Sequence, residues 1–197
     1  ITARGRLLDG RATLDITYTV HPAGVVDIDY RYNVHAELPP LPRLGMLWTL
    51  AADLDRVRWY GPGPHPTYDD RNVERIGIYE TSLMDAWVDY SRPQENGNRT
   101  GVRWLELTAD DGTGLRVEAI GDRPLSCNAL PWPAERLRAT DYSWQLPQPA
   151  ATWLNVDFAQ MGVGGDNSWG ATPHEQYLLR GKTYQYRYRV GLLRGAD

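Results

Sequence analysis

The sequence predicts an all-β fold, an antiparallel sandwich with at most one short helix, forming a single domain over residues 1–197. Apolar and polar residues alternate with a period of two in several stretches, which is typical of strands that bury one face. Short turns rich in glycine, proline and aspartate separate these stretches, and helical periodicity is nearly absent. A chain of 197 residues is long enough to bury a core without disulfides.

Four stretches show the alternation most clearly, and each predicts an antiparallel strand. In the last of them, tyrosine and valine alternate with glutamine and arginine. The four stretches are 13–20, 26–32, 115–119 and 184–190. Turn residues at 22–24, 110–114, 121–122 and 180–182 lie between the predicted strands.

The single predicted helix covers residues 134–140 and is two turns long at most. Pro133 directly before it supports this start, because proline is favoured at the beginning of a helix. Leu137 is expected to face inward. The chain shows no internal repeat and no linker-like run, so the sequence indicates one domain.

The net charge of −4 and the scattered arginines argue against nucleic acid or an anionic membrane as the partner. No apolar run is long enough to span a bilayer, and no signal peptide opens the chain. The one cysteine, Cys127, excludes an internal disulfide and is typical of a reducing compartment. These features predict a cytoplasmic protein.

Eight tryptophans and twelve tyrosines stand against one phenylalanine. Tryptophan and tyrosine combine an apolar ring with a polar group and therefore suit half-exposed contact surfaces. The composition indicates a contact surface for a sugar or for another protein domain.

The most informative segment is 153–170, where an alternating strand leads into a glycine-dense turn. Asn155 and Asp157 are expected to point away from the apolar face of this strand. The glycines at 162, 164 and 165 are expected to allow unusual backbone angles and so to hold Trp169 on a fixed frame. Trp169 is then either a platform for a sugar face or a plug at the end of the sandwich.

Metal and nucleophile motifs are absent from the sequence. The four histidines show no paired spacing, so no metal site is expected in this chain. Glycoside hydrolysis needs two carboxyl groups that flank the scissile bond. The acidic residues in loop-like settings are Asp69, Asp70, Glu95, Asp157 and Asp166.

Glu95 lies in the segment 92–97, which is dense in hydrogen-bonding groups. We interpret it as a carboxylate that ties loop amides together and pairs with Arg71, Arg99 or Arg103. No second carboxylate with an evident acid–base role accompanies it.

Several motifs in this chain resemble one family. They lie at 41–46, 59–71, 90–104, 130–137 and 155–170. In this order they are similar to the C-terminal β-sandwich domain, the small-chain region, of the large bacterial β-galactosidases of glycoside hydrolase family 2. The resemblance spans most of the chain.

The resemblance implies an antiparallel supersandwich similar to galactose mutarotase. It implies that the catalytic glutamates and the magnesium and sodium ligands of the full-length enzyme lie in a barrel domain that this chain lacks, so no catalytic residue, metal or cofactor is expected here. The family's tryptophan that stacks against sugar corresponds to Trp169. The flanking Asp166, Asn167 and Ser168 are expected to support its loop, as is Glu95 in its own loop.

The expected function is therefore that of a non-catalytic domain of a retaining β-galactosidase, completing the sugar pocket with an aromatic wall. The expected partners are the remaining domains of the same polypeptide and a galactoside or glucose, with a homo-oligomeric full enzyme. The family's domain starts upstream, so the resemblance implies trimming at the N-terminus. Pro66-Thr67 and Asp141 depart from the family pattern.

Two other functions stay open. One is a stand-alone mutarotase-like aldose epimerase, with His65 or His174 as the acid and Glu95 as the base. The other is a non-catalytic carbohydrate-binding module.

Overall fold

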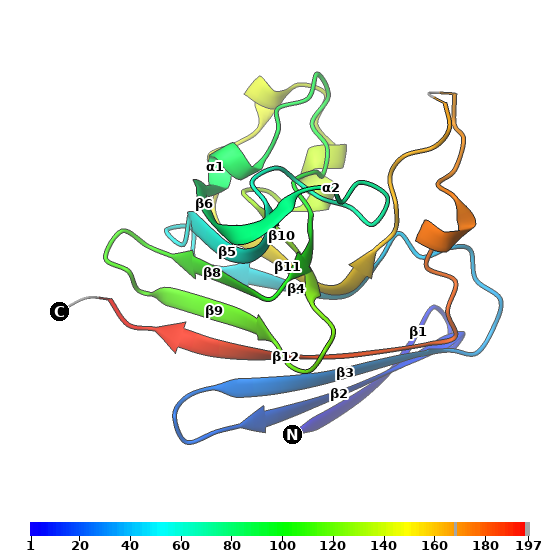
Figure 1. Cartoon of the computed structure of the whole chain (residues 1–197), viewed down its shortest axis with the longest axis horizontal. Helices are drawn as coiled ribbons and strands as arrows, with labels where there is room; N and C mark the ends of the chain where they lie inside the picture. The colour runs from blue at the N-terminus through cyan, green and yellow to red at the C-terminus, as the bar shows by residue number, and fades with distance from the viewer. Residues whose placement is uncertain (168, 196–197) are drawn as a thin grey trace.

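The computed structural model describes residues 1–167 and 169–195 and forms two antiparallel sheets (Figure 1). The larger sheet has eight strands in the order β1-β2-β3-β12-β9-β8-β5-β6, and the smaller has four in the order β4-β11-β10-β7. This architecture confirms the all-β, antiparallel prediction. The strands are β1 (Thr2–Leu7), β2 (Ala12–Val20), β3 (Val26–Val34), β4 (Arg43–Leu50), β5 (Arg56–Gly63), β6 (Arg75–Ser82), β7 (Arg99–Val102), β8 (Trp104–Thr108), β9 (Gly114–Ala119), β10 (Leu125–Leu130), β11 (Thr152–Gln160) and β12 (Thr183–Leu193).

The four most clearly predicted strands correspond to β2, β3, β9 and β12. In the larger sheet they are consecutive neighbours, because β12 pairs with β3 on one side and with β9 on the other. Period-two alternation was therefore a good guide wherever a strand has one face on the core and one face in solvent.

Two short α-helices occur among the described residues, α1 (Leu83–Ala86) and α2 (Ala134–Arg138). The helix α2 confirms the predicted segment, and α1 was not predicted, because four residues are too few to produce a periodicity. Ser82 caps α1 by accepting a hydrogen bond from the Asp85 N–H at 3.0 Å. Single 3₁₀ turns lie at η1 (Ser143–Gln145) and η2 (Glu175–Tyr177).

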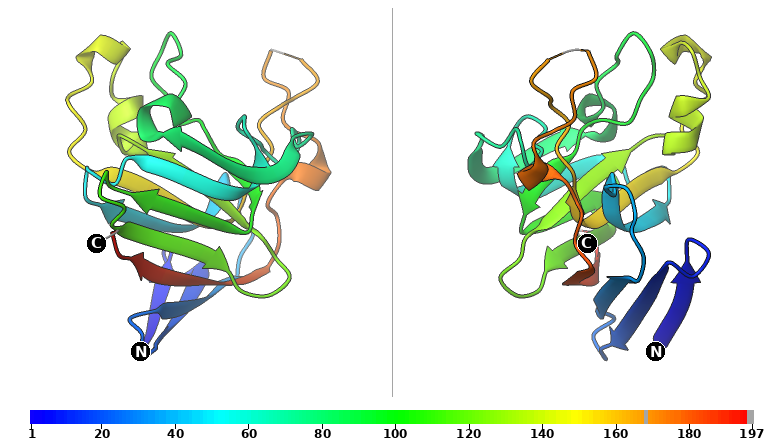
Figure 2. Two further views of the ribbon diagram at one scale, coloured as in Figure 1. Left: turned by 60° about the vertical axis from the view of Figure 1, so that its left-hand side comes forward. Right: turned by 90° about the vertical axis from the view of Figure 1, so that its right-hand side faces the viewer.

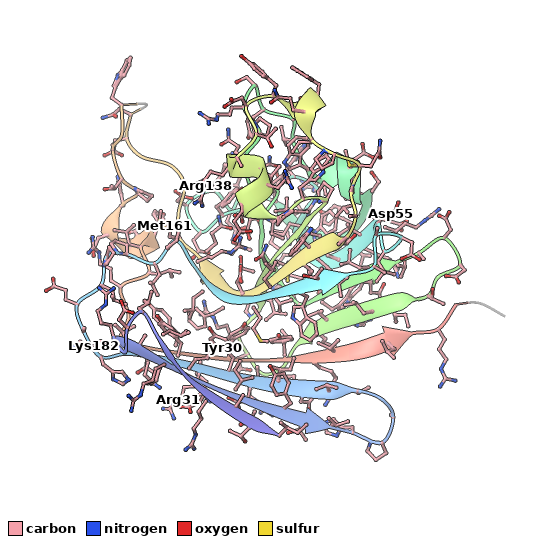
Figure 3. The ribbon with its side chains drawn as sticks, turned by 180° about the vertical axis from the view of Figure 1, so that it is seen from behind. Tyr30, Arg31, Asp55, Arg138, Met161 and Lys182 are labelled. Carbon is pink, nitrogen blue, oxygen red and sulfur yellow. The ribbon has the colours of Figure 1, made fainter. Side chains whose placement is uncertain are left out.

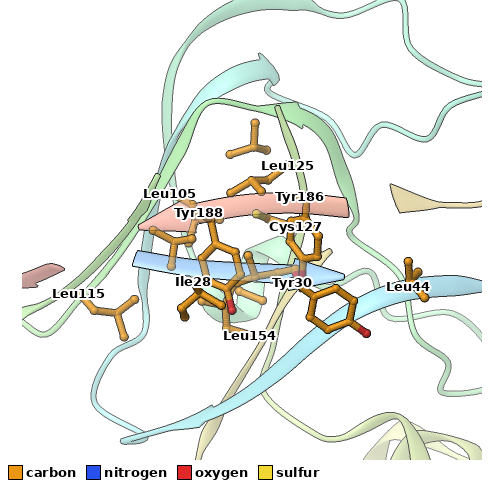
Figure 4. Close-up of a cluster of buried hydrophobic side chains, with 14 of the residues drawn as sticks. Ile28, Tyr30, Leu44, Leu105, Leu115, Leu125, Cys127, Leu154, Tyr186 and Tyr188 are labelled. Carbon is orange, nitrogen blue, oxygen red and sulfur yellow. The ribbon is translucent and has the colours of Figure 1, made fainter. Parts of the chain in front are cut away.

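The core lies between the two sheets and contains tyrosines as well as aliphatic side chains (Figure 4). The Tyr186 hydroxyl donates to the Val156 carbonyl at 2.8 Å, and Trp48 Nε1 donates to the Tyr188 hydroxyl at 3.2 Å. Burial raises the pKa of the Tyr30 hydroxyl to about 12. Much of the tyrosine in this chain thus serves the core and not a contact surface, and the hydroxyls of Tyr186 and Tyr188 find partners across the sheets.

The outer face of the smaller sheet is covered by the segment 87–98. Ser126 on β10 donates to the Asn98 side chain at 2.9 Å, and Asn128 donates to Glu95 at 3.3 Å. On the neighbouring β11, Asn155 and Asp157 are also buried, so its polar side chains do not point into solvent as alternation alone would suggest.

Three connecting segments rise on the same side of the molecule, away from the β1–β3 end (Figures 1 and 2). They are the segment 87–98 after α1, the segment 139–151 after α2, and the segment 161–174 after β11. Together they surround the outer face of the smaller sheet. No helix within the described part of the chain is both long and apolar enough to cross a membrane.

Candidate functional site

The segment after β11 is tied to the body of the protein at its base, next to Met161 (Figure 3). The Gly162 N–H donates to the Tyr177 carbonyl at 2.8 Å, and the Gly164 N–H donates to Asp70 Oδ2 at 2.7 Å. Asp70 therefore anchors a loop that is 94 positions away in the sequence. This contact could not be predicted from the sequence, because it depends on how the sheets assemble.

Close approach requires glycine at residues 162 and 165 of this loop. A Cβ at Gly162 would lie 2.6 Å from Asp70 Oδ2, and a Cβ at Gly165 would lie 2.1 Å from the Ala171 carbonyl oxygen. In this loop the left-handed region is occupied at Gly170, with φ of 95°. The expectation of unusual backbone angles at residues 162, 164 and 165 was wrong, because none of these glycines has a positive φ. The base of the loop is instead held by the hydrogen bonds of Gly162 and Gly164.

Trp169 stands at the exposed end of this loop, with 92% of its surface accessible. The backbone N–H of Trp169 donates to Asn167 Oδ1 at 2.8 Å. Asp166 Oδ1 contacts His174 Nε2 at 2.7 Å. Ser168 lies outside the described residues. Trp169 does not plug the end of the sandwich, since almost all of its ring faces solvent.

A second group of polar side chains lies on the outer face of the smaller sheet. Arg43 Nε donates to Asp157 Oδ2 at 3.0 Å, and Arg43 Nη1 donates to Glu95 Oε1. Asn128 also donates to Glu95 Oε1. Glu95 is thus a carboxylate held by its surroundings, but its arginine partner is Arg43.

The arginines that were expected to pair with Glu95 have other contacts. Arg71 lies over the ring of Tyr68, with its guanidinium carbon 5.3 Å from the ring centroid. Arg99 donates to the Gly97 carbonyl at 2.8 Å, and Arg103 donates to the Gly101 carbonyl at 2.6 Å. None of these three arginines, which were given as examples, is the partner of Glu95, because each makes other contacts in the folded chain.

Strand pairing brings the Arg43 group together. β4 pairs with β11 so that Gly45 stands opposite Asp157. A Cβ at Gly45 would lie 2.0 Å from Asp157 Oδ1 and 2.4 Å from Asp157 Cα, so only glycine leaves room for this carboxylate. Burial raises the pKa of Asp157 to about 6, and the positive charge of Arg43 opposes part of that rise.

A cavity of about 300 Å³ opens beside this group. Its floor comes from β4 and β11, and its walls come from the Glu95 segment and from the start of α2. The lining residues include Arg43, Glu95, Trp132, Trp153, Asn155 and Asp157. The cavity therefore combines two indole rings with charged and amide groups, an arrangement that can bind a small polar molecule.

Neither histidine proposed for an epimerase lines this cavity. His65 Nδ1 contacts Glu74 at 3.0 Å, and His174 contacts Asp166 on the exposed loop. The expected pair of a histidine acid with Glu95 as base is therefore not assembled. Within residues 1–167 and 169–195, no three His, Cys, Asp or Glu side chains are grouped so that they could hold a metal ion.

The family model and the curated relatives that match this chain indicate the same family. A family model described as beta galactosidase small chain matches residues 1–190. Beta-galactosidase BgaC of Bifidobacterium adolescentis is 38% identical over 172 residues, covering 86% of this chain and 16% of that protein. A beta-galactosidase of Priestia megaterium is 37% identical over 169 residues, covering 85% of this chain and 16% of that protein. The chain thus spans about a sixth of the length of these curated relatives.

Among solved structures, a GalM/aldose epimerase homologue from C. elegans aligns with a TM-score of 0.44 at 12% sequence identity. The alignment covers 100% of this chain and 65% of that chain.

Proposed function

The chain belongs to the beta-galactosidase small-chain family, and on that premise we propose that it is the non-catalytic C-terminal domain of a retaining β-galactosidase. The two glutamates that cleave terminal β-D-galactosides such as lactose, and the magnesium and sodium ions, would belong to the rest of a longer polypeptide. The support is the length of the relatives, of which this chain matches only 16%. We place the full enzyme in the cytoplasm, as a homo-oligomer.

In this proposal Trp169 forms an aromatic wall of the sugar pocket. The observation that carries it is the 92% exposure of a tryptophan on a loop whose base is fixed by Asp70 and Tyr177. An indole ring held in solvent by a rigid loop is ready to stack on the apolar face of a sugar. Asp166 and Asn167 would support the loop through their contacts with His174 and with the backbone of Trp169.

The segment 139–151 offers a second exposed aromatic surface on the same side of the molecule. Tyr142 and Trp144 stack with ring centroids 6.0 Å apart and an interplanar angle of 12°. Trp144 is 79% exposed. In the proposed enzyme this stacked pair would contact the other domains of the polypeptide, because exposed paired aromatic rings favour a protein partner.

The test is the substitution Trp169→Ala in the full-length enzyme, with Val73→Ala as the control. Stacking on an aromatic ring contributes about 1 kcal/mol, which corresponds to about fivefold in binding. We expect Trp169→Ala to raise the KM for lactose about fivefold and to reduce transfer of galactose to glucose. The control variant removes a side chain that is 93% exposed from a segment with no proposed contact, and it should leave both quantities near those of the wild type.

Unchanged KM and transfer in the Trp169→Ala enzyme would remove the role assigned to this residue. Polarimetry of freshly dissolved galactose with the 197-residue chain tests the epimerase alternative separately. Accelerated mutarotation by the chain would favour an epimerase over a non-catalytic domain.

A further inference from the structure

The cavity beside Arg43 is made from elements that fix its shape. β4 and β11 form its floor through an antiparallel ladder that is regular from Thr152 to Asp157 and shifts register between Asp157 and Ala159. Trp132 is held in place because its Nε1 donates to the Pro147 carbonyl at 2.8 Å and its ring packs edge-to-face on Trp87 at 5.2 Å. A cavity with such walls is already formed before any ligand arrives, which lowers the entropic cost of binding.

Hydrogen-bonding groups in this cavity remain available to a ligand. Among the described residues, hydrogen bonds from Arg43 reach Oδ2 of Asp157, while Asp157 Oδ1 accepts none. Arg43 and Asn128 both donate to Oε1 of Glu95, which leaves Oε2 without a donor in the same part of the chain. The Asn155 side chain also lines the cavity and forms no hydrogen bond with described residues.

These groups suit a ligand that offers several hydroxyl donors. Glu95 Oε2 can accept from a hydroxyl, because 27% of this side chain is exposed, and the Asn155 amide can both donate and accept. The indole rings of Trp132 and Trp153 provide apolar surface for the C–H groups of the same ligand. Polyhydroxylated rings carry both kinds of surface.

The charge and the volume of the cavity further limit the kind of ligand that it can bind. Two carboxylates share one guanidinium, so the cavity is net negative, and the Arg43 donors are already engaged by Asp157 and Glu95. A phosphorylated or carboxylated ligand would therefore be repelled. A volume of about 300 Å³ lies at the lower limit of small-molecule sites and fits one sugar ring better than a chain of rings.

We propose that this cavity is a binding site for a neutral monosaccharide, a hexopyranose in the cyclic form. Glu95 accepts hydrogen bonds from its hydroxyl groups, Asn155 accepts from or donates to them, and Trp132 and Trp153 contact its apolar face. Asp157 lies beneath these groups and holds Arg43 in place. The site is separate from the loop that carries Trp169, which does not line the cavity. The proposal does not depend on the function proposed for Trp169.

The test is a titration of the ¹⁵N-labelled 197-residue chain with D-galactose and with D-glucose, followed through the indole N–H resonances of its tryptophans. We expect saturable shifts with at least one hexose, and no saturable shift with glucose 6-phosphate. Ala134 lines the cavity at the start of α2, so Ala134→Phe fills the space without removing a polar contact. This variant should keep the wild-type fold, monitored by circular dichroism, and should lose saturable binding.

Glu95→Gln supplies a second variant, which preserves shape while removing one acceptor charge, and should weaken binding severalfold. The absence of saturable shifts with both hexoses in a folded wild-type chain would overturn the proposal. It would also be overturned if Ala134→Phe bound as the wild type does, or if glucose 6-phosphate bound as well as the neutral sugars. Loss of binding in Trp169→Ala with retention in Ala134→Phe would place the sugar on the exposed loop instead.

Discussion

Removing Arg43 should destabilise the protein in a manner that depends on pH. The substitution Arg43→Met keeps a long side chain but withdraws the positive charge that lies between Asp157 and Glu95. Only 2% of the Asp157 side chain is exposed, whereas 27% of the Glu95 side chain is exposed. Asp157 therefore suffers most from the loss, because water cannot replace its partner.

The magnitude follows from this difference in burial. Breaking a buried ion pair by removing one partner costs about 3–5 kcal/mol, and partial hydration of Glu95 favours the lower end of that range. We expect a loss of about 3 kcal/mol in the free energy of unfolding at pH 8. In urea this should lower the midpoint by roughly 1 M or more, given typical slopes for small domains.

The pH dependence follows from the pKa of Asp157. Its pKa rises from 3.8 to about 6 on folding, so between these values the folded chain binds a proton that the unfolded chain has released. The raised pKa thus costs stability as the pH rises through this window, and the full cost, about 3 kcal/mol, is present above pH 6. Without Arg43 the pKa should rise further, so the variant should recover most of its lost stability at pH 5, where Asp157 is protonated.

Arg56→Met is the matched control. Arg56 Nε and Nη2 both donate to one oxygen of Asp110, at 3.0 and 2.7 Å, which repeats the geometry of Arg43 on Asp157 at an exposed site. Urea unfolding followed by tryptophan fluorescence at pH 8 and pH 5 compares the two variants. The control should unfold near the wild-type midpoint at both pH values. An equal loss for Arg43→Met at pH 8 and pH 5, or equal losses in both variants, would refute the reasoning from burial.

Three further outcomes are expected. Gly45→Ala should reduce the free energy of unfolding by about 3 kcal/mol or prevent folding, because its Cβ would clash with the Asp157 backbone. The melting temperature of the variant, compared with that of the wild type, measures this loss. Cys127 is fully buried and burial raises the pKa of its thiol, so a thiol reagent should modify the chain only as fast as urea unfolds it. Trp169→Ala should change stability by less than about 0.5 kcal/mol in urea melts, since the ring contacts mainly water.

The sequence was informative where a strand separates core from solvent. β12 was predicted because Tyr184, Tyr186 and Tyr188 alternate with polar residues that face outward. β10 was not predicted, although its apolar residues also alternate with Ser126 and Asn128. Alternation could not show that both of these polar side chains are buried, because it predicts that the polar face of a strand lies in solvent. Their burial depends on the segment 87–98, which supplies hydrogen-bond partners from elsewhere in the chain.

The two candidate sites also differ in how far the sequence alone could predict them. Trp169 could be singled out because a tryptophan within a glycine-rich segment is a local feature of the sequence. Arg43 could not, since 114 positions separate it from Asp157 and only the pairing of β4 with β11 brings them together. The reason for Gly45 is likewise visible only once Asp157 stands opposite it.

The polar face of β11 is not explained by stability alone. Buried ion pairs add little to stability, and well-packed apolar residues of similar volume are often neutral or better. The floor at Asn155 and Asp157 lies beside apolar neighbours such as Leu130 and Trp153, so an apolar floor would be compatible with the same sheet pairing. Asp157 instead keeps one oxygen that no described residue donates to, and it requires a glycine opposite it. A binding site for hydroxyl groups would explain why the chain keeps a buried charged group and a glycine that reduce stability. For this reason we assign the cavity a ligand.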